Sequence, residues 1–154
     1  MNLRVLQSYW VLGYISDREL PQKVGVCGLE AGLDSEAVYE LASLTTDEPE
    51  DARTCFRKIL QENDLLSISK ADAARILAVV ISKQIIDGEL TPYEGARKIW
   101  DISIKLADYS FHDLDSFIYA ASEYDSRLSE SNFFDNEILK EAFIWVNSGE
   151  AQSS

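Results

Sequence analysis

Side chains that could bind a partner or transfer a proton gather just after Thr91 and Pro92. Tyr93, Glu94 and Arg97 follow within about two turns of a predicted helix, so a hydroxyl, a carboxylate and a guanidinium share one neighbourhood. A carboxylate one turn away from Arg97 would add only about 0.3 kcal/mol to helix stability. We favour packing against a neighbouring helix as the role of this segment. The alternative is a partner-binding patch made by Tyr93, Glu94 and Arg97.

The densest acidic segment consists of Asp47, Glu48, Glu50 and Asp51, interrupted by Pro49. Carboxylates in the first turn of a helix are stabilised by the partial positive charge at its N-terminus. A solvated helix start is therefore the simpler interpretation. The functional alternative is a docking patch for a basic protein surface, which makes these four acidic residues candidates for partner binding.

His112 is the only histidine, and it lies beside Asp113 and Asp115. A histidine next to carboxylates can act as a base, but catalysis also needs a nucleophile or a substrate within reach. Asp113 fits the start of a helix, and we favour that structural role. Paired carboxylates divide acid and base roles when their pKa values differ. An enzyme of that kind would draw on four residues: Asp113, Asp115, Tyr93 and Glu94.

The sequence predicts no metal site and no cofactor site. One histidine and two dispersed cysteines, Cys27 and Cys55, are too few soft ligands for structural zinc. The spaced Asp/Asn-Gly-Glu loop of a calcium site is also missing. Gly25, Gly28 and Gly32 do not follow a strand, as a phosphate-binding loop requires. We expect these glycines to allow close helix packing or simply to weaken a helix instead.

The charge balance favours some partners over others. The formal net charge of -13 at pH 7 comes from 27 acidic and 14 basic side chains. Such a chain is repelled by phosphate backbones and by anionic membrane surfaces, so we expect neither nucleic acid nor membrane as a partner. A basic protein would be attracted, although the simpler interpretation is that acidity keeps a small protein soluble. There is no secretory signal, and the longest apolar run, 76–81, is too short to span a membrane, so we expect a cytoplasmic location.

Helical signals follow one another along the whole chain, and no alternating strand pattern is present. Thr91 has the character of an N-cap, whereas Gly32 and Gly88 fit helix ends. Gly95, in the first turn after Thr91, predicts close approach by another helix. The run 76–81 is apolar on nearly all sides, which is typical of the central helix of a bundle.

These signals predict an all-α fold, a compact bundle of about seven or eight short helices around one central apolar helix. The last two helices are expected over 113–125 and 131–147. At 154 residues the chain has the size of one core. Residues 1–148 are therefore predicted to form a single domain, and residues 149–154 a flexible C-terminal tail.

Two motifs carry a resemblance to other proteins. The first is Leu-Glu-Ala-Gly-Leu-Asp-Ser at 29–35, followed by Leu-Ala-Ser-Leu at 41–44; the second spans 85–100 and contains Pro-Tyr-Glu-Gly-Ala-Arg. Over residues 20–142 the chain resembles a group of small bacterial all-helical proteins for which no activity is established. The resemblance implies a helical domain of bacterial origin and assigns no role to any residue. The small residues at 25–28 depart from the amphipathic helix expected there.

The sequence is compatible with three functions. The leading hypothesis is a non-enzymatic protein-binding module, in its most specific form an immunity- or antitoxin-like neutraliser of a basic toxin. The first alternative is a self-associating structural or adaptor protein, forming a homo-oligomer through the C-terminal helix. That helix has more apolar surface than one face requires, and its large apolar residues are Phe133, Phe134, Phe143, Ile144 and Trp145. The second alternative is an enzyme that uses the carboxylates named above.

Overall fold

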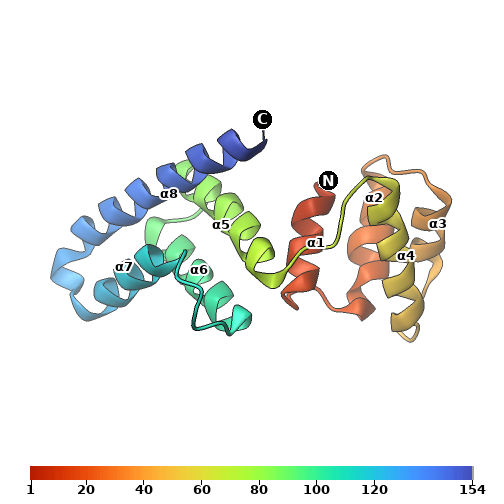
Figure 1. Cartoon of the computed structure of the whole chain (residues 1–154), viewed down its shortest axis with the longest axis horizontal. Coiled ribbons are helices and arrows are strands. Elements are labelled where there is room, and N and C mark those ends of the chain that lie inside the picture. Colours follow the sequence, from red (N-terminus) through yellow and green to blue (C-terminus); the bar gives the residue numbers. More distant parts are fainter. Residues whose placement is uncertain (154) are drawn as a thin grey trace. The chain divides into compact units, whose positions relative to one another are not determined.

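The structure is a computed structural model that describes residues 1–153, and the side chains of residues 1–149 (Figure 1). In this part of the chain every regular element is helical, and eight are α-helices, which confirms the predicted all-α fold. The contacts divide the chain into two compact units, residues 1–69 and 70–154. A single domain over 1–148 therefore stays a prediction. The predicted tail, 149–154, falls mostly on residues whose side chains lie outside the described part, and it stays a prediction too.

The first unit is built from short helices around one core. Its elements are α1 (Leu3–Val11), the 3-10 turn η1 (Asp17–Glu19), η2 (Pro21–Val26), α2 (Cys27–Glu30), α3 (Glu36–Ser43) and α4 (Pro49–Glu62). The largest buried side chains of this core include Leu20, Leu41, Phe56 and Ile59. Trp10 of α1 packs edge-on against Phe56, with ring centroids 5.0 Å apart, so aromatic contact joins α1 to α4.

A partly buried carboxylate, Asp17, adds a polar link between α1 and α4. It accepts hydrogen bonds from Trp10 Nε1 at 2.7 Å and from Arg53 Nε at 2.9 Å. Burial alone would raise the pKa of Asp17, but these two donors and the positive charge of Arg53 outweigh it and lower the pKa. Asp17 is therefore ionised at neutral pH and holds the two helices together.

Residues 21–26 form a π-helix, which overlaps the segment 25–28 where an amphipathic helix was expected. Gly25 lies within it, and a Cβ atom at this position would come within 2.6 Å of the Ala42 backbone nitrogen. The missing side chain therefore lets η2 and α3 approach closely. This contact confirms close helix packing as the role of Gly25.

The second unit contains α5 (Lys70–Ile86), α6 (Pro92–Leu106), α7 (Asp115–Ser126), the 3-10 turn η3 (Leu128–Glu130) and α8 (Ser131–Ser153). Helix α5 packs against α6 and α8, α7 packs against the same two helices, and α6 and α8 also contact each other (Figure 1). Leu77, Ala78 and Ile81 of the apolar run 76–81 are buried in this unit, and a central place of that run in one bundle stays a prediction. A Cβ atom at Gly95 would overlap the Ile85 side chain, which confirms the predicted close approach at the start of α6.

The start of α6 forms as its sequence predicts. Thr91 Oγ1 accepts a hydrogen bond from Glu94 N at 3.1 Å, and Glu94 Oε2 accepts one from Thr91 N at 3.0 Å. Gly88, which ends α5, has a φ of +77°, where a side chain would be strained. Among residues 1–153, no helix is both long enough and apolar enough to cross a membrane.

Candidate protein-interaction surface

The acidic segment 47–51 lies at the N-terminus of α4. Glu48 Oε2 accepts hydrogen bonds from the Thr45 backbone nitrogen at 2.9 Å and from its hydroxyl at 3.2 Å. Glu50 and Asp51 occupy the first helical turn, where their charge is favourable. Asp47 is exposed beside them. These positions account for the segment as a helix start, and its role as a docking patch stays a prediction.

Tyr93 and Arg97, from the other predicted patch, lie in the second unit and make aromatic contacts. The Tyr93 hydroxyl donates to Asp125 of α7, and the Tyr93 ring stacks on Tyr124 with centroids 4.4 Å apart. The hydrogen bond to Asp125 and partial burial raise the pKa of Tyr93. The Arg97 guanidinium lies over the Trp100 ring at 4.5 Å.

These contacts give the patch a structural role. Tyr93 joins α6 to α7, and Glu94 closes the capping box at Thr91. Two of the three predicted binding residues are thus engaged in positioning helices. Binding of a partner by Tyr93, Glu94 and Arg97 stays a prediction.

The carboxylates around His112 have separate partners. Asp113 pairs with Arg75 of α5 at 2.8 Å, whereas Asp115, the first residue of α7, lies 3.0 Å from His112 Nδ1. Asp113 thus lies just before α7, so the predicted helix start at 113 is displaced by two residues. No cluster of three or more His, Cys, Asp or Glu side chains suited to a metal ion occurs within the described residues.

The two cysteines differ in exposure. Cys55 is buried in the core of the first unit, and burial raises the pKa of its thiol, as do Glu40 and Asp51. Cys55 therefore packs as a small buried hydrophobic residue. Cys27 is only half-buried, and neither cysteine forms a disulfide.

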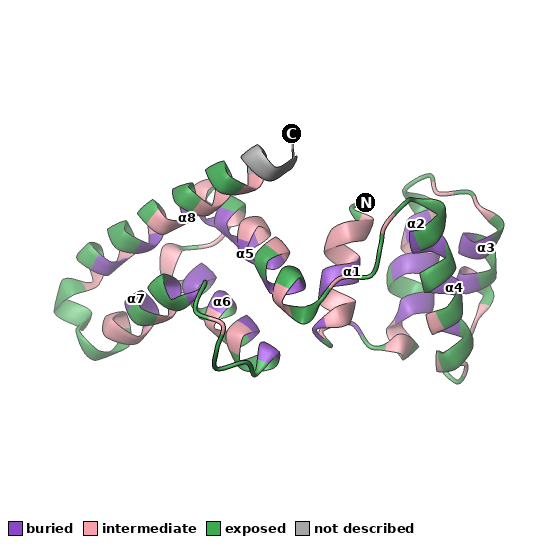
Figure 2. Cartoon of the chain, in the orientation of Figure 1, coloured by how far each residue is buried: buried purple, intermediate pink, exposed green. Residues whose placement is uncertain are grey.

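The outer side of α8 leaves large apolar side chains in solvent. Phe134 and Ile138 face the core and are buried, while Phe133, Phe143 and Ile144 are 58%, 48% and 58% exposed. Figure 2 shows exposed residues recurring along this helix between the buried ones. Covering one such side chain would gain roughly 1 kcal/mol, because full burial of Phe or Ile is worth about 1.5–3 kcal/mol and about half of each is exposed.

The five large apolar residues that give the C-terminal helix its apolar excess lie on two sides of α8. Phe134 is 3% exposed and belongs to the core. Trp145 is half-buried, and its ring lies 6.5 Å from that of Phe117 on α7. Phe134 and Trp145 therefore belong to the inward side of α8, and the apolar excess that stays exposed consists of Phe133, Phe143 and Ile144. The spacing along the helix explains why Phe134 and Trp145 lie together, because residues eleven positions apart return to the same side of an α-helix.

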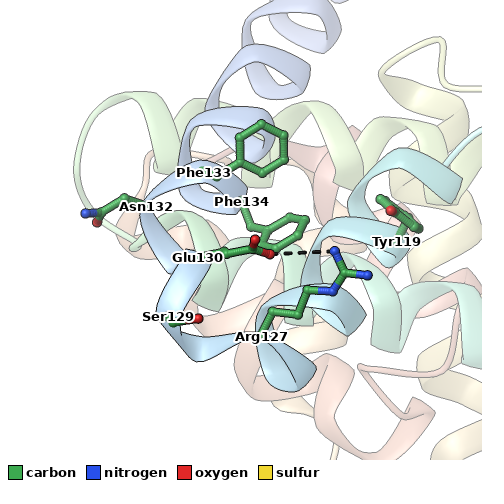
Figure 3. Close-up of a pocket in the computed structure, with 7 residues that line it drawn as sticks. All are labelled: Tyr119, Arg127, Ser129, Glu130, Asn132, Phe133 and Phe134. Carbon is green, nitrogen blue, oxygen red and sulfur yellow. Dashed lines mark ion pairs between the residues drawn. The ribbon is translucent and has the colours of Figure 1, made fainter.

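A hollow of about 450 Å³ opens where η3 meets the start of α8 (Figure 3). It is lined by Tyr119, Arg127, Ser129, Glu130, Asn132, Phe133 and Phe134. Arg127 pairs with Glu123 at 3.0 Å and with Glu130 at 3.6 Å, so its charge is balanced from within the unit. Sequence reasoning missed this hollow because Tyr119, Arg127 and the residues of η3 come together only through the α7–α8 turn.

A second hollow, of about 340 Å³, continues along α8. It is lined by Phe133, Asn136, Glu137, Leu139, Lys140 and Phe143. Phe133 borders both hollows, so they form one continuous surface. Lys140 Nζ lies 3.3 Å from Glu137 Oε1, and both side chains are exposed. We call five residues the α8 face: Phe133, Glu137, Lys140, Phe143 and Ile144.

Comparison with known proteins found no matching family model, no similar curated protein and no similar solved structure. The resemblance to small bacterial helical proteins therefore stays a prediction. The function has to be inferred from the geometry of the chain itself.

Proposed function

We propose that this chain is a non-enzymatic protein-binding module and that the α8 face is its contact surface. The observation that carries the proposal is the row of half-exposed apolar side chains on one helix, Phe133, Phe143 and Ile144. Contiguous exposed apolar surface on a small protein is typical of an interaction site. Aromatic side chains are also enriched at the centres of protein interfaces.

The form of the surface favours a protein partner over a small molecule. Both hollows are open and follow one helix, whereas sites for small molecules enclose most of the ligand surface. An elongated apolar surface along a helix fits the apolar side of a second helix. The two polar side chains at its centre, Glu137 and Lys140, are exposed and would set the register of such a partner.

The geometry favours this surface over the acidic segment as the binding site. Glu48 is engaged in closing the turn at Thr45, and the neighbouring carboxylates are accounted for by the start of α4. The α8 face, by contrast, has apolar area that the described side chains of its unit leave exposed. We therefore propose the second unit as the part that binds a protein.

Site-specific photo-crosslinking in the cells that naturally produce the chain tests the proposal. A photoreactive phenylalanine analogue in place of Phe143 should give crosslinked protein products. The matched control carries the same analogue at Ile104, which is 65% exposed on α6. Both positions are exposed, apolar and helical, so general stickiness affects them equally. Absence of products at position 143, or equal yields at the two positions, would contradict the proposal.

A further inference from the structure

We infer that the partner of the α8 face is a second copy of this chain, paired antiparallel through α8 about a two-fold axis. The inference rests on the proposed function, because it names the partner of the same surface. It is drawn from the order of apolar and charged residues along the helix. Two-fold dimers are the commonest symmetric assemblies, and their interfaces pair one surface with itself.

The order of residues on the α8 face is self-complementary when the chain direction is reversed. Phe133, Glu137, Lys140 and Ile144 follow one another at intervals of four, three and four, the spacing of residues along a helix–helix seam. A two-fold axis between positions 138 and 139 places Phe133 opposite Ile144 of the second copy. The same axis places Glu137 opposite Lys140. Because the axis is two-fold, each match occurs twice: two apolar Phe133–Ile144 contacts and two Glu137–Lys140 pairs of opposite charge.

Two other registers lose this match. An axis through position 140 places Lys140 opposite its own counterpart, which juxtaposes like charges. An axis through position 138 pairs Phe133 with Phe143 but leaves Glu137 opposite Leu139. Of these three registers, only the axis between 138 and 139 satisfies both the apolar and the charged residues.

The ion pair already present on the helix does not prevent this exchange. The Lys140 and Glu137 side chains are 73% and 44% exposed, and exposed pairs one turn apart contribute little to stability. Both groups can therefore turn from their intrahelical partner to the opposing helix. In the dimer the same four groups form two bridges across the seam.

The size and charge of the chain determine how strong the dimer should be. The seam from position 133 to 144 is about 16 Å long at 1.5 Å per residue, shorter than a standard interface requires. Two copies, each with a net charge of -13, also repel each other. We therefore expect a dimer that forms at high micromolar concentration and dissociates on dilution.

Charge reversal with sedimentation analysis of the full chain tests the inference. Wild-type chain at high micromolar concentration should sediment above the monomer mass of 17.3 kDa. In the variant Lys140→Glu, the new carboxylate lies opposite Glu137 of the second copy. The dimer should weaken by roughly tenfold, because the two Glu137–Lys140 ion pairs across the seam, worth roughly 0.7 kcal/mol each, are lost. The control Lys98→Glu lies on α6 and changes the net charge by the same amount as Lys140→Glu, and it should leave the dimer intact. The double variant E137K/K140E restores opposite charges and should recover wild-type association.

Three results would overturn the inference: a monomeric wild-type chain at high micromolar concentration, equal weakening by Lys140→Glu and Lys98→Glu, or a double variant that stays monomeric. Circular dichroism of each variant checks that the helices are intact. A monomeric chain that still crosslinks a different protein from position 143 would keep the proposed function and refute the second copy as its partner. Absence of any product at position 143 would refute the proposed function as well.

Discussion

Replacing Gly25 by Ala places a methyl group against backbone that has little freedom to move. The new Cβ would lie 2.6 Å from the nitrogen and 2.7 Å from the Cα atom of Ala42, so η2 and α3 must separate. Overpacking of a core costs about 1–3 kcal/mol, and contact with backbone places this site at the upper end. Ala recovers about 0.5–1 kcal/mol of helix propensity. We therefore expect Gly25→Ala to reduce the free energy of unfolding of the first unit by about 2 kcal/mol.

Hydrogen exchange of peptides from residues 1–69 measures that free energy locally, because the slowest amides report opening of the whole unit. Gly28→Ala is the matched control. Its Cβ would lie 3.1 Å from Leu33 Cδ1, the end of a side chain that can turn away. We expect a change below about 1 kcal/mol there. Equal stability of the two variants, or a Gly25→Ala chain at least as stable as wild type, would refute the close-packing explanation.

Three further substitutions test individual side chains by urea unfolding. The pKa of Asp17 is lowered by folding, so its contribution is present above the ordinary pKa of about 4 and is lost as the pH falls through the folded value. Asp17→Asn should therefore cost about 2 kcal/mol at neutral pH and almost nothing in strong acid; a loss that is independent of pH would contradict this. Burial raises the pKa of Asp135, so its ionised form opposes folding above that pKa. Asp135→Asn should stabilise the chain at neutral pH but not in acid, and destabilisation at neutral pH would contradict the burial argument. The buried Ser82 hydroxyl has no hydrogen-bond partner among the described residues, so Ser82→Ala should leave stability unchanged or raise it by about 1 kcal/mol; a loss above about 1 kcal/mol would reveal a bond.

Local signals in the sequence were sufficient to predict most of the helix ends. Thr91 and Glu94 form a capping box, with Pro92 at the first helical position, because all its hydrogen bonds lie within four residues. Gly32 and Gly88 have the positive φ that a helix end favours. The class of fold followed from the helical spacing of apolar residues.

Features that depend on distant residues could not be predicted in this way. The π-helix at 21–26 forms where Gly25 meets the backbone of α3, a contact that spacing within the helix does not reveal. The bonds of Asp17 to Trp10 and Arg53 join segments up to 36 positions apart. Division of the chain into two units likewise depends on which helices pack together.

The candidate site was predicted only in part. Apolar excess on the C-terminal helix pointed to an interface, and Phe133, Phe143 and Ile144 are exposed there. The inward position of Phe134 agrees with its helical spacing from Trp145, eleven positions later on the same side of the helix. The hollows beside Phe133 need the turn between α7 and α8, which only the folded chain provides.

Disulfide trapping tests the central claim, that the α8 face binds a second copy in a defined register. In the inferred dimer, cysteines at positions 133 and 144 of opposite copies face each other, so the F133C/I144C chain should form a covalent dimer under mild oxidation. Two cysteines at position 133 alone would be about 16 Å apart, beyond the roughly 7 Å limit between Cα atoms, so F133C should remain monomeric. Rapid dimerisation of F133C/I144C with a monomeric F133C chain is the predicted result. Equal dimerisation of the two variants, or none in either, would contradict the claim.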